Sequence, residues 1–177
     1  NCLEQVGKNG LLILGQQGGY IYPELIGKYS ATNPTEAEGI DLEPAKVPYW
    51  HYNSQKNNAN IVTYSSLQPK LYAKDDAEMS IEAQLGRYVK EKIYTCLDNY
   101  SAFQSEGFKV EIAEDSEVTS TAKVGDTGVA FLFTQKIKAA QGTEQQEMEQ
   151  FYVKIPLELK HYYEVASLVA QAEQNYS

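Results

Sequence analysis

The residues from Ser80 to Ser101 constrain the fold more than any other stretch of the chain. Their apolar side chains recur every three or four residues and therefore share one continuous face of a helix. This face consists of Ile81, Leu85, Tyr88, Val89, Ile93, Cys96, Leu97 and Tyr100. The spacing predicts a core helix, with either Asp76 or Ser80 supplying the side-chain oxygen that caps its first turn.

The chain has two cysteines, and their positions leave three interpretations open. Cys96 lies on the apolar face of the predicted central helix, and Cys2 begins a second helical stretch over residues 2–16. We predict a disulfide between them, which requires an oxidising compartment. Two buried thiols that pack as small hydrophobic side chains are the first alternative. A catalytic thiolate with a histidine partner is the second, although the apolar surroundings of Cys96 disfavour it.

Little regular structure is expected between the two predicted helices. The glycines at 18–19 tolerate the left-handed backbone that ends a helix, so they close the first one. Residues 20–22 have the composition of a short strand, which Pro23 stops. Residues 24–47 show no periodicity, so we expect a long surface loop there.

The rest of the chain alternates between apolar and polar residues more often than it repeats with helical spacing. Residues 48–52 and 61–64 predict a hairpin with a turn at Asn57 and Asn58. Four further strands are expected at 110–112, 118–124, 129–137 and 151–157, and a helix at 161–174 with Tyr162, Val165, Ala166, Leu168 and Val169 on its inner side.

This order of elements predicts the α+β class. The connections between the four later strands are too short for parallel crossovers, so the strands form an antiparallel meander. We expect this meander to pack against the N-terminal, central and C-terminal helices. A chain of 177 residues is long enough for one domain spanning 1–177 with a single hydrophobic core.

The charge balance limits the classes of partner. The chain has 24 acidic residues against 15 Lys and Arg, a formal net charge of −9, whereas binding to a phosphate backbone requires basic residues. We therefore predict no nucleic-acid partner. No run of apolar residues approaches the roughly eighteen of a membrane span. Because the sequence begins with Asn1 and not with Met, we expect a missing upstream segment to have carried a targeting or anchoring element.

Tyrosine is frequent, with 14 residues against 5 phenylalanines and 1 tryptophan. A tyrosine buries its ring while its hydroxyl reaches water or a polar partner, and aromatic side chains dominate the binding energy of interfaces. We therefore predict a binding surface beside the 24–47 loop, formed by Tyr20, Tyr22, Tyr49, Trp50 and Tyr52. The alternative is that tyrosine serves as the strand-forming aromatic of a sheet with one wet face.

No pattern in the sequence predicts a catalytic or metal site. His51 and His161 are the only histidines, and neither has a second ligand at the spacing of a zinc motif. The acidic clusters at 75–78 and 111–117 lack the glycine bend and alternating ligands of a calcium loop. The glycine-rich stretch 15–20 follows a helix, whereas a phosphate-binding loop precedes one. We therefore predict no catalytic residue, no metal and no cofactor.

Several motifs together resemble a group of archaeal proteins from small-genome lineages of the DPANN type. These motifs are Cys2-Leu3, the run from Leu14 to Ile21, Val47-Pro48-Tyr49-Trp50, Arg87-Tyr88, the run from Cys96 to Asn99, Phe103 and Gly107-Phe108. Proteins of this group look like single-pass proteins with an N-terminal membrane anchor and a domain outside the cell. The resemblance covers most of the chain. It implies export and a disulfide, but no activity for any residue.

Three functional hypotheses follow. The first is a non-catalytic extracytoplasmic domain of a membrane-anchored surface protein, used for attachment, envelope structure or interaction with a protein or cell-surface partner. Glycosylation patterns at Asn99 and Asn175 agree with export. The second is an extracellular PAS-like sensor, which requires a pocket lined by converging polar groups. The third is a cysteine-dependent hydrolase, which requires a thiol beside His51 or His161.

Overall fold

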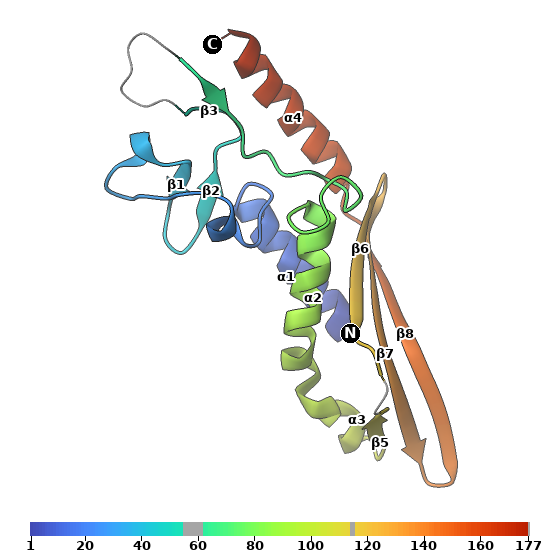
Figure 1. Ribbon diagram of the computed structural model, residues 1–177. Helices are drawn as coiled ribbons and strands as arrows, with labels where there is room; N and C mark the ends of the chain where they lie inside the picture. The colour runs from blue at the N-terminus through green and yellow to red at the C-terminus, as the bar shows by residue number, and fades with distance from the viewer. Residues whose placement is uncertain (55–61, 114–115, 177) are drawn as a thin grey trace.

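The computed structural model describes residues 1–54, 62–113 and 116–176 (Figure 1). Four antiparallel strands form the main sheet: β5 (Lys109–Ile112), β6 (Thr119–Gly125), β7 (Gly128–Gln141) and β8 (Glu144–Ile155). Helices α1 (Cys2–Gln16) and α2 (Ile81–Leu97) lie against one face of this sheet, and α4 (Leu159–Tyr176) follows the last strand. The predicted α+β class and its three helices are thereby confirmed.

Strand β7, with 14 residues, pairs on both of its sides. Strand β8 runs along one side, from Ile155 opposite Val129 to Glu144 opposite Gln141. The other side is shared, because β6 pairs with the first half of β7 and β5 pairs with the second half. Strands β6, β7 and β8 therefore form a meander, whereas β5 pairs with β7 and not with its neighbour in sequence.

Buried side chains alternate with more exposed ones along β7, and this alternation decides which face of the sheet meets the helices. Phe131 and Phe133 are buried and point to the same side as Ile155 at the end of β8. On the opposite face Leu132 pairs with Tyr152, whose ring is exposed. The sheet therefore has one buried face and one wet face, as antiparallel sheets commonly do.

Helix α2 covers this buried face as the central core helix that the sequence predicts. Its inner side consists of Ile81, Leu85, Val89 and Ile93, all of them fully buried. The helix begins after Ser80, whose Oγ accepts a hydrogen bond from the main-chain N–H of Ala83 at 3.2 Å. Of the two predicted caps, Ser80 is thus the correct one. Asp76 instead accepts main-chain hydrogen bonds in the preceding turn.

The central helix ends at Leu97, earlier than the expected Ser101. Asp98, Asn99 and Tyr100 have φ angles of 44°, 51° and 62°, in the left-handed region that non-glycine residues seldom adopt. They form the 3₁₀ turn η3 (Asp98–Tyr100), and the short helix α3 (Ser101–Ser105) follows in a new direction. Tyr100 is still buried, so the apolar face continues across this kink.

Residues 20–22 are not the strand that their composition predicts. The carboxamide of Gln84 takes the place of a partner strand. Its Oε1 accepts a hydrogen bond from the N–H of Ile21 at 2.8 Å, and its Nε2 donates to the Met79 carbonyl at 2.8 Å. Gln84 is fully buried in α2, so this segment is held against the helix by a side chain.

Glu82, in the first turn of α2, makes a second set of buried contacts. Its Oε1 accepts a hydrogen bond from the N–H of Val124 in β6 at 2.9 Å. Its Oε2 accepts from the N–H of Ala73 at 3.0 Å and lies 3.2 Å from the Lys123 ammonium. A buried carboxylate is tolerated only when its oxygens are paired in this way.

The long surface loop predicted over residues 24–47 contains some regular structure that the prediction did not include. This stretch holds two 3₁₀ turns and two short strands that pair with each other: η1 (Pro23–Leu25), η2 (Pro34–Glu36), β1 (Gly39–Asp41) and β2 (Lys46–Pro48). Strands of three residues are too short to produce a visible alternation in the sequence. The hairpin predicted from residues 48–52 and 61–64 exists in shortened form as β3 (Tyr52–Asn53) and β4 (Tyr64–Ser65). Its predicted turn at Asn57 and Asn58 lies outside the described residues.

The inner side predicted for the C-terminal helix is also wrong. Tyr162, Val165, Ala166, Leu168 and Val169 are all exposed. The buried side of α4 instead carries Tyr163, Ser167 and Ala170. The reason is the direction of the helix, which runs past the end of the sheet and away from it (Figure 1). Its inner side therefore meets loop residues and not the apolar face of the sheet.

Gly86 allows α2 to approach β6 closely. A Cβ atom at this position would lie 2.9 Å from the main-chain oxygen of Ser120. We expect Gly86→Ala to lower the free energy of unfolding, because the strand would have to move. Gly15→Ala in α1 is the matched control, since a Cβ there meets nothing within 4 Å. Chemical denaturation should show that Gly15→Ala stabilises the protein by up to about 1 kcal/mol, as expected for Gly→Ala in a helix. Equal effects of the two substitutions would contradict the close approach.

Candidate functional site

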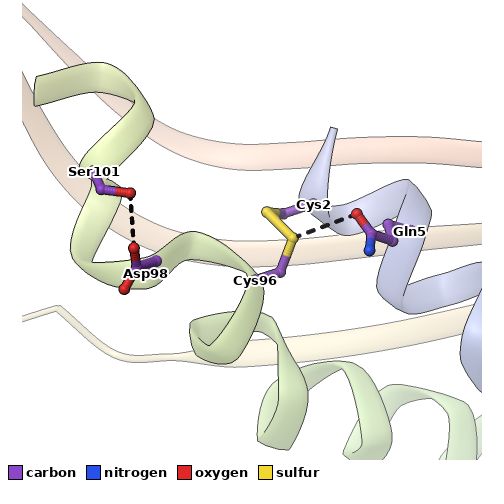
Figure 2. The surroundings of a disulfide bond; sticks show 5 residues. All are labelled: Cys2, Gln5, Cys96, Asp98 and Ser101. Atoms are coloured by element: carbon purple, nitrogen blue, oxygen red, sulfur yellow. Dashed lines mark hydrogen bonds between the residues drawn. A yellow bond between two sulfur atoms is a disulfide. The ribbon is translucent and has the colours of Figure 1, made fainter. Parts of the chain in front are cut away.

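A disulfide joins Cys2 to Cys96, as predicted. The two Sγ atoms are 2.11 Å apart and the two Cα atoms 5.6 Å apart. Figure 2 shows that the bond connects the first residue of α1 to the last turn of α2. The carboxamide oxygen of Gln5 lies 3.8 Å from the Cys96 sulfur, a van der Waals contact because a disulfide sulfur carries no proton.

The disulfide decides between the three interpretations of the cysteines. Because both sulfurs are bonded to each other, neither is a buried thiol and neither can form a thiolate. The cysteine-dependent hydrolase therefore lacks its nucleophile. Beside the bond, the hydroxyl of Ser101 donates to the Asp98 carboxylate at 3.0 Å and braces the turn between α2 and α3 (Figure 2).

Two of the five predicted aromatic residues lie in the 20–22 segment, whose main chain is hydrogen-bonded to Gln84 of α2. Tyr20 is 5% exposed, and burial raises its pKa to about 12. Its ring lies too deep to contact a partner. Tyr22 is half-buried beneath the guanidinium of Arg87, 4.7 Å from the ring centre. Its hydroxyl donates to the Glu91 carboxylate at 2.7 Å, and burial is the main cause that raises its pKa.

The other three aromatic residues are half-buried where the small strands approach α4. The indole N–H of Trp50 donates to the Gly18 carbonyl at 2.9 Å, and its ring centre is 5.7 Å from that of Tyr163. The rings of Tyr49 and Tyr52 are 6.3 Å apart. Burial raises the pKa of Tyr52, whose hydroxyl donates to Glu38 at 3.4 Å. These three rings contact loops and helices of the same chain, and these contacts cover much of the ring surface.

The largest group of exposed apolar side chains on one helix is on α4. Tyr162 is 60% exposed, Val165 47%, Leu168 65% and Val169 58%. These positions are separated by three, three and one residues, so they form a single stripe along the helix. Monomeric proteins rarely leave such a stripe in water, and contiguous exposed apolar surface is typical of interaction sites.

The opposite side of α4 is fastened to the rest of the protein. The Tyr163 hydroxyl donates to the Pro69 carbonyl at 2.8 Å. Gln68 Nε2 donates to the Ser167 hydroxyl at 2.6 Å. At the start of the helix the Lys160 ammonium lies 2.7 Å from the Asp126 carboxylate. These contacts fix which side of α4 faces the solvent, so the apolar stripe, which we name the α4 stripe, is held outward.

The sequence predicted the apolar spacing of the α4 stripe correctly but not its exposure to solvent. The helical spacing of its residues is visible in the sequence, but we assigned it to the core. The narrow inner side of α4 holds Tyr163, Ser167 and Ala170. The inner side therefore offers one aromatic ring and two small residues, fewer large apolar side chains than the exposed side.

The sensor hypothesis requires a pocket lined by converging polar groups. Beside the disulfide, the structure has an open cavity of about 370 Å³. It is lined by apolar side chains of α1, α2 and the sheet, among them Leu3, Ile93 and Phe133. The cavity thus has the size of a ligand site without the polar groups that the sensor hypothesis specified.

The two histidines take different positions. His51 lies between β2 and β3 and stacks on Tyr64 with ring centres 4.6 Å apart. His161 is exposed in the first turn of α4 beside Tyr162. Within residues 1–54, 62–113 and 116–176, no three His, Cys, Asp or Glu side chains lie where they could together hold a metal ion. In the same part of the chain, no helix combines the length and the apolar character needed to cross a bilayer.

Comparisons with known proteins give no relative. No protein-family model, no curated protein and no solved structure matches the chain. Its function therefore has to be inferred from its own residues and their arrangement.

The disulfide generates a prediction about stability. It closes a loop between residues 94 positions apart, and a cross-link over such a distance restricts the unfolded chain. We expect the double variant Cys2→Ala/Cys96→Ala to lose about 2–5 kcal/mol of unfolding free energy, measured by urea denaturation. Each single variant should lose a comparable amount, because either one breaks the bond. A double variant as stable as the parent protein would show that the bond adds nothing to stability.

The burial of Tyr20 generates a prediction about alkaline pH. A tyrosine of the unfolded chain ionises near pH 10, whereas the folded-state pKa of Tyr20 is about 12. The neutral phenol therefore favours the folded state below pH 10, and this contribution is lost as the pH rises from 10 to 12. The wild-type protein should lose more unfolding free energy over this interval than Tyr20→Phe, by on the order of 2 kcal/mol. Tyr162→Phe, which changes an exposed ring, is the control for the loss of one phenol. Parallel curves for wild type and Tyr20→Phe would refute this role of burial.

Proposed function

We propose that this chain is a non-catalytic, extracytoplasmic interaction domain of a membrane-tethered surface protein, and that the α4 stripe is the surface that contacts a protein partner. The single observation that carries the proposal is the stripe itself. Four large apolar side chains, Tyr162, Val165, Leu168 and Val169, face water on a helix that is fixed from its other side.

The disulfide supports the proposed location. Disulfides form and persist in oxidising environments outside the cytosol and are rare inside it. The bond between Cys2 and Cys96 is consistent with an oxidising, extracytoplasmic compartment. The resemblance to anchored proteins with an external domain agrees with this location, and the tether is part of the proposal.

The chemistry of the α4 stripe supports a protein as the partner. A helix with an exposed apolar side fits a hydrophobic groove or a second helix, and residues spaced by three and four positions are the usual anchors. The net charge of −9 opposes binding to nucleic acid or to an anionic membrane surface. A protein groove offers the apolar contact without requiring positive charge from this chain.

The aromatic residues predicted to bind have a supporting part in this proposal. Trp50 packs on Tyr163, which lies on the inner side of α4. The side chain of Gln68 donates hydrogen bonds to the hydroxyls of both Tyr163 and Ser167 on the same helix. The aromatic region therefore positions the α4 stripe, and its half-buried rings would lie at the rim of the interface.

Site-specific photo-cross-linking tests the proposal in the cells that make the protein. A photoreactive amino acid at position 168 should join the chain to a second polypeptide, because Leu168 is 65% exposed at the centre of the stripe. The same amino acid at position 42 is the matched control, since Leu42 is 61% exposed in the turn between β1 and β2.

A charge in the stripe completes this test. Val165→Glu lies one helical turn from Leu168 and, being on the exposed side, should leave the fold intact. We expect it to abolish the adduct at position 168. Equal adducts at positions 168 and 42, no adduct at 168, or an adduct that persists in Val165→Glu would each contradict the proposal.

A further inference from the structure

The cavity beside the disulfide is enclosed by parts of the chain that are far apart in sequence. It lies between the start of α1, the end of α2, α3 and the buried side of β7 and β8, and has a volume of about 370 Å³. Its apolar walls include Leu3, Ile93, Leu97, Phe133 and Phe151. Cys2 also lines it, so the disulfide lies beside the wall of the cavity.

The polar groups around this cavity are already engaged or lie in solvent. The Tyr100 hydroxyl, which belongs to a lining residue, donates to Gln135 Oε1 at 2.9 Å in a buried hydrogen bond. Asn1, the other polar residue of the lining, is exposed. A ligand that brought several N–H or O–H groups inside would therefore lose hydrogen bonds to water that these two residues do not fully replace. The interior therefore favours hydrocarbon over polar groups.

One segment that lines the cavity follows an unusual backbone. Three consecutive non-glycine residues, Asp98 to Tyr100, adopt left-handed φ angles before α3 begins. The segment they lead into brings Ala102 and Phe103 to the cavity lining. Strained backbone of this kind is often found where a chain clamps a ligand.

We propose that this cavity binds the alkyl chain of an uncharged single-chain amphiphile, with the head group at the mouth in water. At about 30 Å³ per non-hydrogen atom, the share of a water molecule in the liquid, this volume leaves room for a chain of roughly twelve carbons. The net charge of −9 repels an anionic head group, which favours an uncharged one. This site is separate from the α4 stripe and does not depend on the proposed function.

Titration with alkyl glucosides below their micelle concentrations tests the site. Hexyl, heptyl and octyl glucoside are added to the disulfide-bonded protein, and the methyl NMR signals of Leu3, Ile93 and Leu97 are followed. We expect the Kd to fall about fourfold with each added methylene, which corresponds to about 0.8 kcal/mol per buried methylene. Glucose alone should shift none of these signals, and octanoate should bind more weakly than octyl glucoside.

A matched pair of variants separates this site from general adsorption. Ala102→Trp places a large ring in the mouth from an exposed position, so it should weaken octyl glucoside binding at least tenfold without disturbing the core. Ala166→Trp makes the same change at an exposed position of α4 and should leave the Kd unchanged. Binding independent of chain length, equal effects of the two variants, or shifts confined to the methyl signals of Val165, Leu168 and Val169 would each overturn the proposal.

Discussion

Helix α2 is fastened at both ends, and the remaining elements depend on this arrangement. At its start, the buried side chains of Glu82 and Gln84 accept main-chain hydrogen bonds from β6 and from the segment that follows α1. At its end, Cys96 is covalently bonded to α1. Without these partners, the free-energy cost of burying the polar groups would exceed the stabilisation from their packing. The position of α2 over the sheet is therefore set by paired polar groups as well as by apolar contact.

Much of this architecture could be predicted from local pattern. The core helix and the alternation along β7 follow from residue spacing, whereas the disulfide was one of three interpretations that the two cysteines left open. The segment at residues 20–22 could not be predicted, because its hydrogen-bond partner is the side chain of Gln84, more than sixty positions away. The exposed side of α4 could not be predicted either. Amphipathic spacing tells which side of a helix is apolar, but not whether the same chain covers it.

The candidate sites differ in how far the sequence could reveal them. The aromatic residues were visible by composition, yet Tyr20 is buried and Trp50 is half-buried with its N–H bonded to Gly18. The helical spacing of the α4 stripe could be recognised in the sequence, but its exposure follows only from the direction of α4 in the fold. The cavity beside the disulfide could not be predicted from the sequence, because an unfilled volume depends on how closely elements distant in sequence pack together. Side-chain types alone carry no information about such a gap.

The disulfide also changes what a break in the main chain would do. The two half-cystines enclose β1, β2 and the two 3₁₀ turns around them within one covalent ring. A protease that cuts once in this ring produces two polypeptides that remain joined through sulfur. Helix α1 would stay attached to α2 after such a cut, and release of the fragment would require both hydrolysis and reduction. In an oxidising environment, where disulfides persist, the two fragments of a nicked molecule would therefore stay covalently connected.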